Sequence, residues 1–343
     1  MNCLFFIQLD MKCGGDVKRT GYCLIGGTGR CGTTILKTVF SRHPDVADIP
    51  EWRFSTDPDG LIDFYSGLLA SWSPFLFDKK LKRLESTLMD LGGGNVLQTL
   101  YRLAMNRLGI QKLFPVNLIP RYSDIHIRKV CPEYKTMVRT LIDELTMFRY
   151  KGHWTGNNLF EKRSIAYSGL QPAELLAEIL GRFFRNVIKR TLESQGKSVY
   201  LEDNTWNILH FKSLLDLIPE AKLVHIYRDP RDVVCSFIKQ TWMPSDLDQS
   251  SKIYMDLMDS WWAVRDRIPV GSFLEISLEG LVSEPEKTIR EVAQFWDMRW
   301  HESLLGTPLN RSHSGRWKKE LSKEEQNYLD KRLSRYIQKL NYK

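Results

Sequence analysis

The chain has 343 residues, of which 43% are hydrophobic and 26% are charged, a balance typical of a chain that folds around a core. This composition excludes disorder over most of the chain, and no apolar run is long enough to predict an integral membrane segment. The net charge is +8, because 49 Lys and Arg outnumber 41 Asp and Glu. That balance favours an anionic ligand: a nucleotide, a sulfated or phosphorylated small molecule, a polyanion or a membrane surface.

The cysteines and the first residues indicate a reduced, cytoplasmic setting. None of the six cysteines forms a CxxC pair, and their spacing matches neither a zinc site nor a disulfide framework. The apolar stretch at 3–9 is short and follows no basic residue, so we expect no secretory signal there. Metal-binding motifs such as HExxH are also missing, so we expect no metal.

In chain order, the first predicted element is a buried strand at Tyr22–Gly26, which leads through a glycine-rich loop into a helix at Thr33–Ser41. A long, mostly helical stretch over 60–195 follows, including a helix at Pro172–Ser194. Strands and helices then alternate, with strands at Ser198–Leu201, Lys222–Tyr227 and Ser272–Leu278 and helices at Thr205–Leu217, from Arg231 and at Glu284–Trp296. This order predicts a three-layer α/β fold with a central parallel sheet, a P-loop-like phosphate-binding loop and a large helical insertion.

The glycine-rich loop Gly26–Thr34 (GGTGRCGTT) predicts a phosphate site, since it follows a strand and opens a helix. Glycines let backbone N–H groups turn inward, and the helix N-terminus adds partial positive charge. Gly27 and Gly32 have the spacing of a Walker A loop, but Thr33 stands where a P-loop kinase or ATPase carries Lys. Arg30 is the cation available inside the loop.

A second basic motif lies in Lys222–Phe237 (KLVHIYRDPRDVVCSF). Its strand delivers Arg228 at the carboxyl end, where open α/β sheets bind ligands, and Ser236 follows eight residues later on the next helix. A guanidinium and a hydroxyl placed in this way can converge on one phosphate. The alternative is a surface Arg–Asp pair at a turn. Together, the two motifs fit a nucleotide with phosphates at its 5′ and 3′ ends.

With these two motifs the sequence resembles the sulfotransferases that use 3′-phosphoadenosine 5′-phosphosulfate. Their loop [RK]-x-G-[TS]-[TS], which binds the 5′-phosphosulfate, is matched by RCGTT at 30–34, and RDPRDV at 228–233 is a frequent family sequence. In the family a strand-end Arg and a Ser eight residues later bind the 3′-phosphate. The resemblance therefore implies that the donor is bound by Gly29, Arg30, Cys31, Gly32, Thr33, Thr34, Arg228 and Ser236.

Two later segments agree with this resemblance. LEGLVSEP at 278–285 resembles the family's Y-E-D-L-x-x-x-P segment, with Leu278 in place of Tyr and Gly280 in place of Asp. SGRWKKELS at 314–322 resembles the C-terminal loop that closes over the cofactor. The resemblance places four residues of that loop at the cofactor, namely Gly315, Arg316, Trp317 and Lys318.

The segment 42–53 (RHPDVADIPEWR) resembles the corresponding part of the tyrosylprotein and carbohydrate sulfotransferases, which place a Glu eight residues after the His. The resemblance implies that Glu51 is the catalytic base. Arg30 would stabilise the charge that grows on the leaving phosphate, and Trp52 and Arg53 would contact the acceptor.

The chain departs from the family at Asp203, where members often carry a Lys that assists the leaving group. This leaves three possibilities open: Arg30 acts alone, a Lys from the insertion substitutes, or activity is reduced. Lys37, on the first helix, is expected to be a solvated charge.

The resemblance also suggests how the chain is organised. We expect one sulfotransferase-like domain over 1–343, with a cofactor-binding α/β core at 20–56 and 198–322. The insertion at 60–195 would lie on the acceptor side as a lid, and a C-terminal helix would span 323–343.

The expected activity is transfer of the sulfuryl group to an acceptor hydroxyl by in-line displacement, without a metal. The acceptor stays open among carbohydrate, tyrosyl and small alcohol or phenol, and the oligomeric state is not predicted. The alternatives are a P-loop nucleotide kinase and a catalytically inactive nucleotide-binding protein. We expect no nucleic-acid partner, since no recognised binding module is present.

Overall fold

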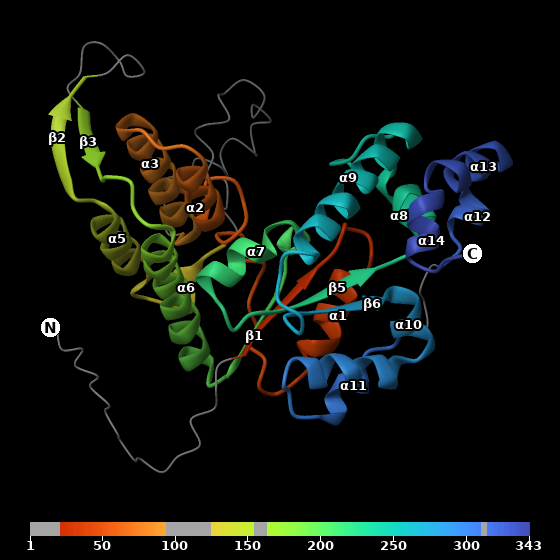
Figure 1. Ribbon diagram of the computed structural model, residues 1–343. Coiled ribbons are helices and arrows are strands. Elements are labelled where there is room, and N and C mark those ends of the chain that lie inside the picture. Colours follow the sequence, from red (N-terminus) through yellow and green to blue (C-terminus); the bar gives the residue numbers. More distant parts are fainter. Residues whose placement is uncertain (1–20, 94–124, 154–162, 310–313) are drawn as a thin grey trace, which may run out of the picture.

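A parallel four-stranded sheet forms the centre of the protein in the computed structural model, which describes residues 21–93, 125–153, 163–309 and 314–343 (Figure 1). The strand order is β4–β1–β5–β6, and every neighbouring pair is parallel. The strands are β1 (Gly21–Gly26), β4 (Val199–Asp203), β5 (Lys222–Tyr227) and β6 (Phe273–Ser277). The predicted α/β class with a central parallel sheet is confirmed, and each predicted strand lies close to its expected position.

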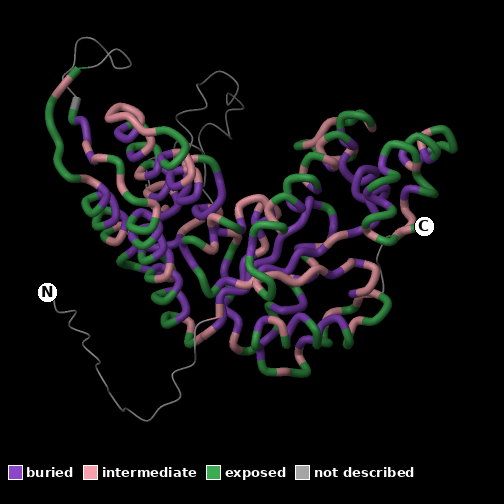
Figure 2. Tube along the Cα trace, in the orientation of Figure 1, coloured by how far each residue is buried: buried purple, intermediate pink, exposed green. Residues whose placement is uncertain are grey.

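Helices cover both faces of this sheet, which gives the three expected layers (Figure 1). α1 (Thr33–Phe40) and α11 (Pro285–Phe295) lie on one face, and α7 (Asn207–Leu217) and α9 (Leu247–Arg265) lie on the other. The central strands are therefore buried from both sides, as the tube in Figure 2 shows. This double burial explains why β1 and β5 read as nearly continuous apolar runs instead of alternating ones.

The insertion packs its helices together beside the sheet, at the left of Figure 1. These helices are α2 (Leu61–Ala70), α3 (Pro74–Leu91), α5 (Tyr134–Leu145) and α6 (Ala173–Gln195). The stretch is mostly helical, as expected, and it also contains an antiparallel hairpin, formed by β2 (Phe148–Gly152) and β3 (Arg163–Tyr167), that the sequence did not predict. Phe148 lies opposite Tyr167, with ring centroids 4.8 Å apart, and such cross-strand aromatic pairs stabilise a hairpin.

Shorter helices complete the described part of the chain. They are η3 (Ile127–Lys129), α8 (Pro230–Phe237), α10 (Leu278–Ser283), η4 (Glu302–Gly306), α12 (Trp317–Glu320), α13 (Lys323–Arg332) and α14 (Ser334–Lys339). The prediction of one C-terminal helix over 323–343 was wrong, because the helix breaks at Leu333. Leu333 is fully buried, and the turn there lets both short helices pack against the rest of the molecule.

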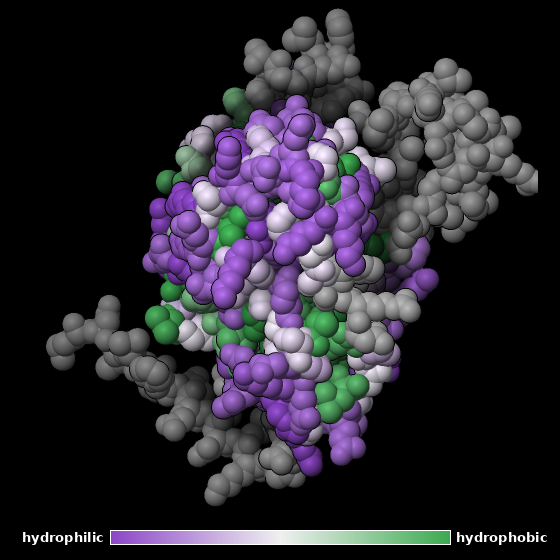
Figure 3. All heavy atoms as spheres, turned by 90° about the vertical axis from the view of Figure 1, so that its right-hand side faces the viewer, coloured by the Kyte–Doolittle hydropathy of each residue, from purple (hydrophilic) through white to green (hydrophobic). Residues whose placement is uncertain are grey.

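The basic excess of the C-terminal helices is balanced by α9. Arg332 pairs with Asp248 at 3.2 Å, and the ammonium of Lys339 lies 3.5 Å from the ring centroid of Trp262. Tyr336 stacks on Trp262 with centroids 5.4 Å apart, and its hydroxyl donates to Asp259 at 2.8 Å. Figure 3 shows the face that carries these C-terminal helices as largely hydrophilic, with apolar residues in smaller patches.

Tyr336→Ala should lower the free energy of unfolding by about 3 kcal/mol, because it removes a buried ring that stacks on Trp262. Tyr336→Phe keeps the ring and loses the hydrogen bond to Asp259, so it should cost only about 1 kcal/mol. Urea unfolding of both variants measures the difference. Equal losses in the two variants would contradict the packing role given to the ring.

Candidate functional site

The candidate site lies at the carboxyl ends of β1, β4 and β5, which meet at one edge because the strands are parallel. In the sheet register, Ile25 lies beside Asp203, and Gly26 lies beside His225. The loop after β1, the end of β4 and Arg228 after β5 therefore lie at the same edge. This is the position at which open α/β sheets bind their ligands.

The backbone of the glycine-rich loop has the turns that a phosphate cradle requires. Gly29, Arg30 and Gly32 have φ values of 86°, 57° and 109°. Gly32 cannot be replaced without strain, because a Cβ there would lie 2.8 Å from the Leu278 side chain. α1 then begins at Thr33 without a side-chain cap at Gly32, so its first N–H groups are available to an anion.

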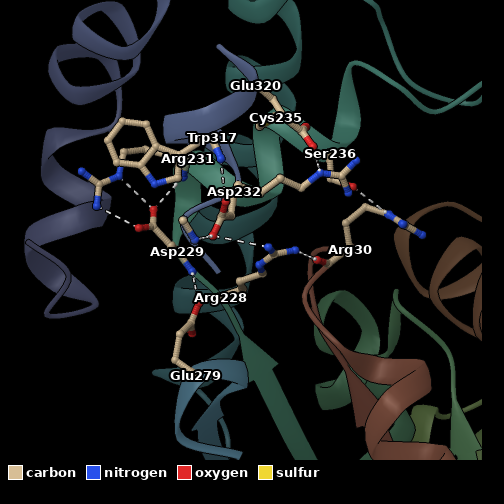
Figure 4. A network of polar contacts seen from close by, with 12 residues as sticks. Arg30, Arg228, Asp229, Arg231, Asp232, Cys235, Ser236, Glu279, Trp317 and Glu320 are labelled. Atoms are coloured by element: carbon tan, nitrogen blue, oxygen red, sulfur yellow. Dashed lines mark hydrogen bonds and ion pairs between the residues drawn. The ribbon is translucent and has the colours of Figure 1, made fainter. Parts of the chain in front are cut away.

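The two basic motifs form one site (Figure 4). Nε of Arg30 donates to Oγ of Ser236 at 3.0 Å, although the two residues lie 206 positions apart. Nη1 of Arg228 donates to the carbonyl oxygen of Arg30 at 3.4 Å. Arg228 is 6% exposed, whereas Arg30 is exposed, so one guanidinium is fixed beneath the loop and the other lies at its surface.

Asp232 connects this pair to the C-terminal loop. Its fully buried carboxylate pairs with Nη2 of Arg228 at 3.3 Å and accepts from the backbone N–H groups of Gly315, at 2.8 Å, and Trp317, at 3.0 Å. No role in the site was expected for Asp232 from the sequence. Asp232 lies in the first turn of α8, and its spacing of four residues after Arg228, which precedes the helix, was the available signal.

Arg231 also connects α8 to the C-terminal part of the chain. Its guanidinium donates to both carboxylate oxygens of Asp229, at 3.0 and 2.8 Å, and to Asp330 at 2.8 Å. It also lies 4.2 Å from the ring centroid of Trp317. The alternative of a surface Arg–Asp pair therefore does not hold for Arg231, which is 5% exposed. These contacts of Arg231 hold the C-terminal loop against α8.

The remaining residues of the predicted donor site differ in how far their side chains are buried. Cys31 is fully buried, and burial raises the pKa of its thiol, so it is not placed to act as a nucleophile. Thr33 is buried at the start of α1, and Thr34 is exposed beside it. In the C-terminal loop, Arg316 pairs with Glu320 and Lys318 is exposed.

The residues predicted for the acceptor side do not all lie together. Glu51 is 37% exposed and its carboxylate is 3.1 Å from Arg53. Trp52 instead lies in the core, 1% exposed, with its ring centroid 6.1 Å from that of Phe54. Glu51 and Arg53 are thus open to a bound molecule, while the ring of Trp52 has no accessible face. Burial alternates along this segment, and the middle residue is the one that lies inward.

Glu202 is a site residue that sequence reasoning missed. This residue of β4 is 3% exposed, and Oε1 accepts from the hydroxyl of Ser55 at 3.4 Å. Oε2 is buried without a hydrogen-bond partner among the described residues. Burial, followed by the negative charge of Glu51, raises the pKa of Glu202 to about 8. A carboxyl group among the apolar residues of SVYLED was the sequence signal.

The next residue, Asp203, is paired. Its Oδ1 lies 2.9 Å from Nζ of Lys37, and the two side chains are 10% and 21% exposed. The expectation that Lys37 is a solvated charge was wrong, because α1 packs beside β4 and brings the ammonium onto the strand end. The charge of Lys37 also lowers the pKa of Glu202, while burial and the charge of Glu51 raise it. Lys37 and Glu51 therefore both act on the Glu202 carboxyl.

Two wider observations concern metals and membranes. Within 21–93, 125–153, 163–309 and 314–343, no three His, Cys, Asp or Glu side chains cluster as metal ligands. In the same parts of the chain, every helix is too short or too polar to cross a bilayer.

A model of the sulfotransferase family matches residues 123–302, which is more than half of the chain. The chain belongs to the sulfotransferase family. The match includes β4, Arg228 and Ser236 and begins after the glycine-rich loop. No curated protein matches the sequence significantly.

Solved structures that resemble this sulfotransferase chain are distant. The sulfotransferase domain from the curacin biosynthetic pathway has 12% identity and a TM-score of 0.46, covering 95% of this chain and 99% of that one. Sulfotransferase STF9 from Mycobacterium avium has 12% identity and a TM-score of 0.42, with coverage of 96% and 79%. Retinol dehydratase, in complex with androsterone and inactive cofactor PAP, has 10% identity and a TM-score of 0.33, with coverage of 92% and 80%.

Glu202→Gln should stabilise the sulfotransferase increasingly as the pH rises from 5 to 8. The pKa of Glu202 is raised to about 8 in the folded state, so folding holds a proton that the unfolded chain releases from about pH 4.5 upward. The wild type therefore loses stability over this window, and Gln does not titrate. The gain should reach the order of a few kcal/mol by pH 8.

Urea unfolding at several pH values measures this gain, with the exposed Glu291→Gln as the matched control. A Glu202→Gln gain that is the same at pH 5 and pH 8 would contradict the raised pKa.

Proposed function

We propose that this protein transfers the sulfuryl group of 3′-phosphoadenosine 5′-phosphosulfate to an acceptor hydroxyl. The observation that carries the proposal is that Arg30 is hydrogen-bonded to both Ser236 and Arg228 at the carboxyl edge of the sheet. The hydrogen bond from Arg30 to Ser236 joins the loop suited to a 5′-phosphate to a hydroxyl suited to a 3′-phosphate. Family membership supports the same reading.

The residues present fit this donor. The left-handed turns at Gly29, Arg30 and Gly32, with the uncapped start of α1, suit the 5′-phosphosulfate. Arg228 and Ser236 suit the 3′-phosphate, since a guanidinium and a hydroxyl, both buried at this edge of the sheet, can offer charge-assisted hydrogen bonds to it. The Gly315–Lys318 segment lies next to them through Asp232 and would bound the nucleotide on that side.

The donor supplies the sulfuryl group: a bond forms between the acceptor oxygen and sulfur, and the sulfur–oxygen bond to the 5′-phosphate breaks with its electrons on that oxygen. Glu51 takes the proton of the acceptor hydroxyl, for which its exposure suits it. Arg53 pairs with the Glu51 carboxylate at 3.1 Å and so positions it. Arg30 and the loop N–H groups stabilise the charge on the 5′-phosphate.

The rival functions are favoured less by these side chains. A nucleotide kinase needs a Lys on the transferring phosphates, and Thr33 occupies that place. An inactive nucleotide-binding protein would keep Arg228 and Ser236 and would have no need for Glu51. The acceptor class is left among carbohydrate, tyrosyl and small alcohol or phenol.

3′-Phosphoadenosine 5′-phosphate should raise the melting temperature of the protein by several degrees more than ATP at equal concentration, because ATP lacks the 3′-phosphate. Ser236→Ala should weaken bisphosphate binding about tenfold, since one hydrogen bond to a charged group is lost. Arg228→Ala should abolish this binding. Thermal shift and titration calorimetry measure both effects. Equal protection by the two nucleotides would exclude the assigned donor.

Glu51→Gln should bind the bisphosphate as the wild type does and lose about 100-fold or more in turnover, because the base is gone while the nucleotide contacts remain. Transfer of labelled sulfate to a panel of carbohydrate, tyrosyl and phenolic acceptors measures turnover. Full activity in this variant would remove Glu51 from the base role, and inactivity of the wild type on every acceptor would favour the inactive binding protein.

A further inference from the structure

An ammonium group lies at the carboxyl end of β4 without a role in the function proposed so far. It belongs to Lys37, on α1, and it is held 2.9 Å from Oδ1 of Asp203, the last residue of β4. Asp203 lies beside Ile25 in the sheet register, and Ile25 precedes Gly27 of the loop by two residues. The ion pair therefore stands at the same strand edge as the phosphate cradle.

The direction of the Lys37 side chain places its charge toward the loop. Side chains on an α-helix lean toward the helix N-terminus, and α1 begins at Thr33, one turn before Lys37. Asp203 takes one of the three N–H donors of the ammonium, and the side chain is still 21% exposed. Donors are thus left over for a further partner.

A second carboxyl group, that of Glu202, lies buried next to this ion pair on β4. Glu202, fully buried in the strand, is mostly neutral at pH 7 because burial and Glu51 raise its pKa to about 8. Glu202 therefore does not compete with Asp203 for the ammonium. The charge of Glu51 raises the pKa of Glu202 and the charge of Lys37 lowers it, so the proposed base and the ammonium both act electrostatically on this buried carboxyl.

We infer that Lys37, positioned by Asp203, binds the sulfuryl group of the donor. This inference rests on the proposed function. The ammonium would hydrogen-bond the sulfuryl oxygens beyond the reach of the loop N–H groups, and Asp203 would fix it there. The competing reading is a purely structural ion pair that ties α1 to β4.

The test compares two nucleotides that differ only in the sulfuryl group: 3′-phosphoadenosine 5′-phosphosulfate and 3′-phosphoadenosine 5′-phosphate. Calorimetric titration without an acceptor gives the ratio of their dissociation constants for each variant. Lys37→Met should weaken binding of the phosphosulfate about tenfold and change binding of the bisphosphate less than twofold. Lys189→Met, an exposed lysine paired with Glu193, is the matched control and should change neither.

Moving the ammonium separates the two readings. In the double variant Lys37→Met/Asp203→Lys an ammonium returns to the strand end but no ion pair exists, so the phosphosulfate preference should recover at least in part. Asp203→Asn also removes the ion pair and keeps Lys37, so it should change the ratio less than Lys37→Met does. Thermal melting of each variant shows whether the fold is kept.

Each outcome decides between the readings. A ratio unchanged by Lys37→Met, or equal effects of Lys37→Met and Asp203→Asn with no recovery in the double variant, would overturn the inference and leave the proposed function standing. If neither nucleotide binds the unsubstituted chain, the proposed function fails and the inference fails with it.

Discussion

The buried carboxylate of Asp232 is the interaction on which the candidate site depends. It neutralises Arg228 and at the same time accepts hydrogen bonds from two backbone N–H groups of the C-terminal loop. A guanidinium with 6% exposure would be costly to bury without such a partner. Arg228 in turn holds the carbonyl of Arg30, so one carboxylate links the loop after β1, the end of β5 and the C-terminal loop.

Much of the fold follows from local sequence patterns. β1 and β5 are apolar runs that end in a glycine-rich loop and in an arginine, and both patterns have a local physical cause. The β2–β3 hairpin and the break at Leu333 did not follow in this way. Both depend on contacts between distant residues, because Phe148 pairs with Tyr167 and the turn at Leu333 matters only once α9 is in place.

The candidate site was predictable where its residues stand in motifs and less so where charges act across elements. Arg30, Arg228 and Ser236 were expected together and lie together. Lys37 reads as a surface charge on a helix, and only the packing of α1 beside β4 brings it to Asp203. Trp52 reads as an aromatic ring next to Glu51, but tertiary packing buries it in the core.

The central claim is that Arg228 and Ser236 bind a 3′-phosphate while the loop after β1 binds the 5′ end of the same nucleotide. The most direct measurement is a calorimetric titration of the unsubstituted protein with 3′-phosphoadenosine 5′-phosphate and with adenosine 5′-phosphate, which differ only in the 3′-phosphate. The account predicts that the bisphosphate binds at least about 100-fold more tightly, because a buried guanidinium and a hydroxyl both contact the extra group. Equal affinity for the two nucleotides would contradict it.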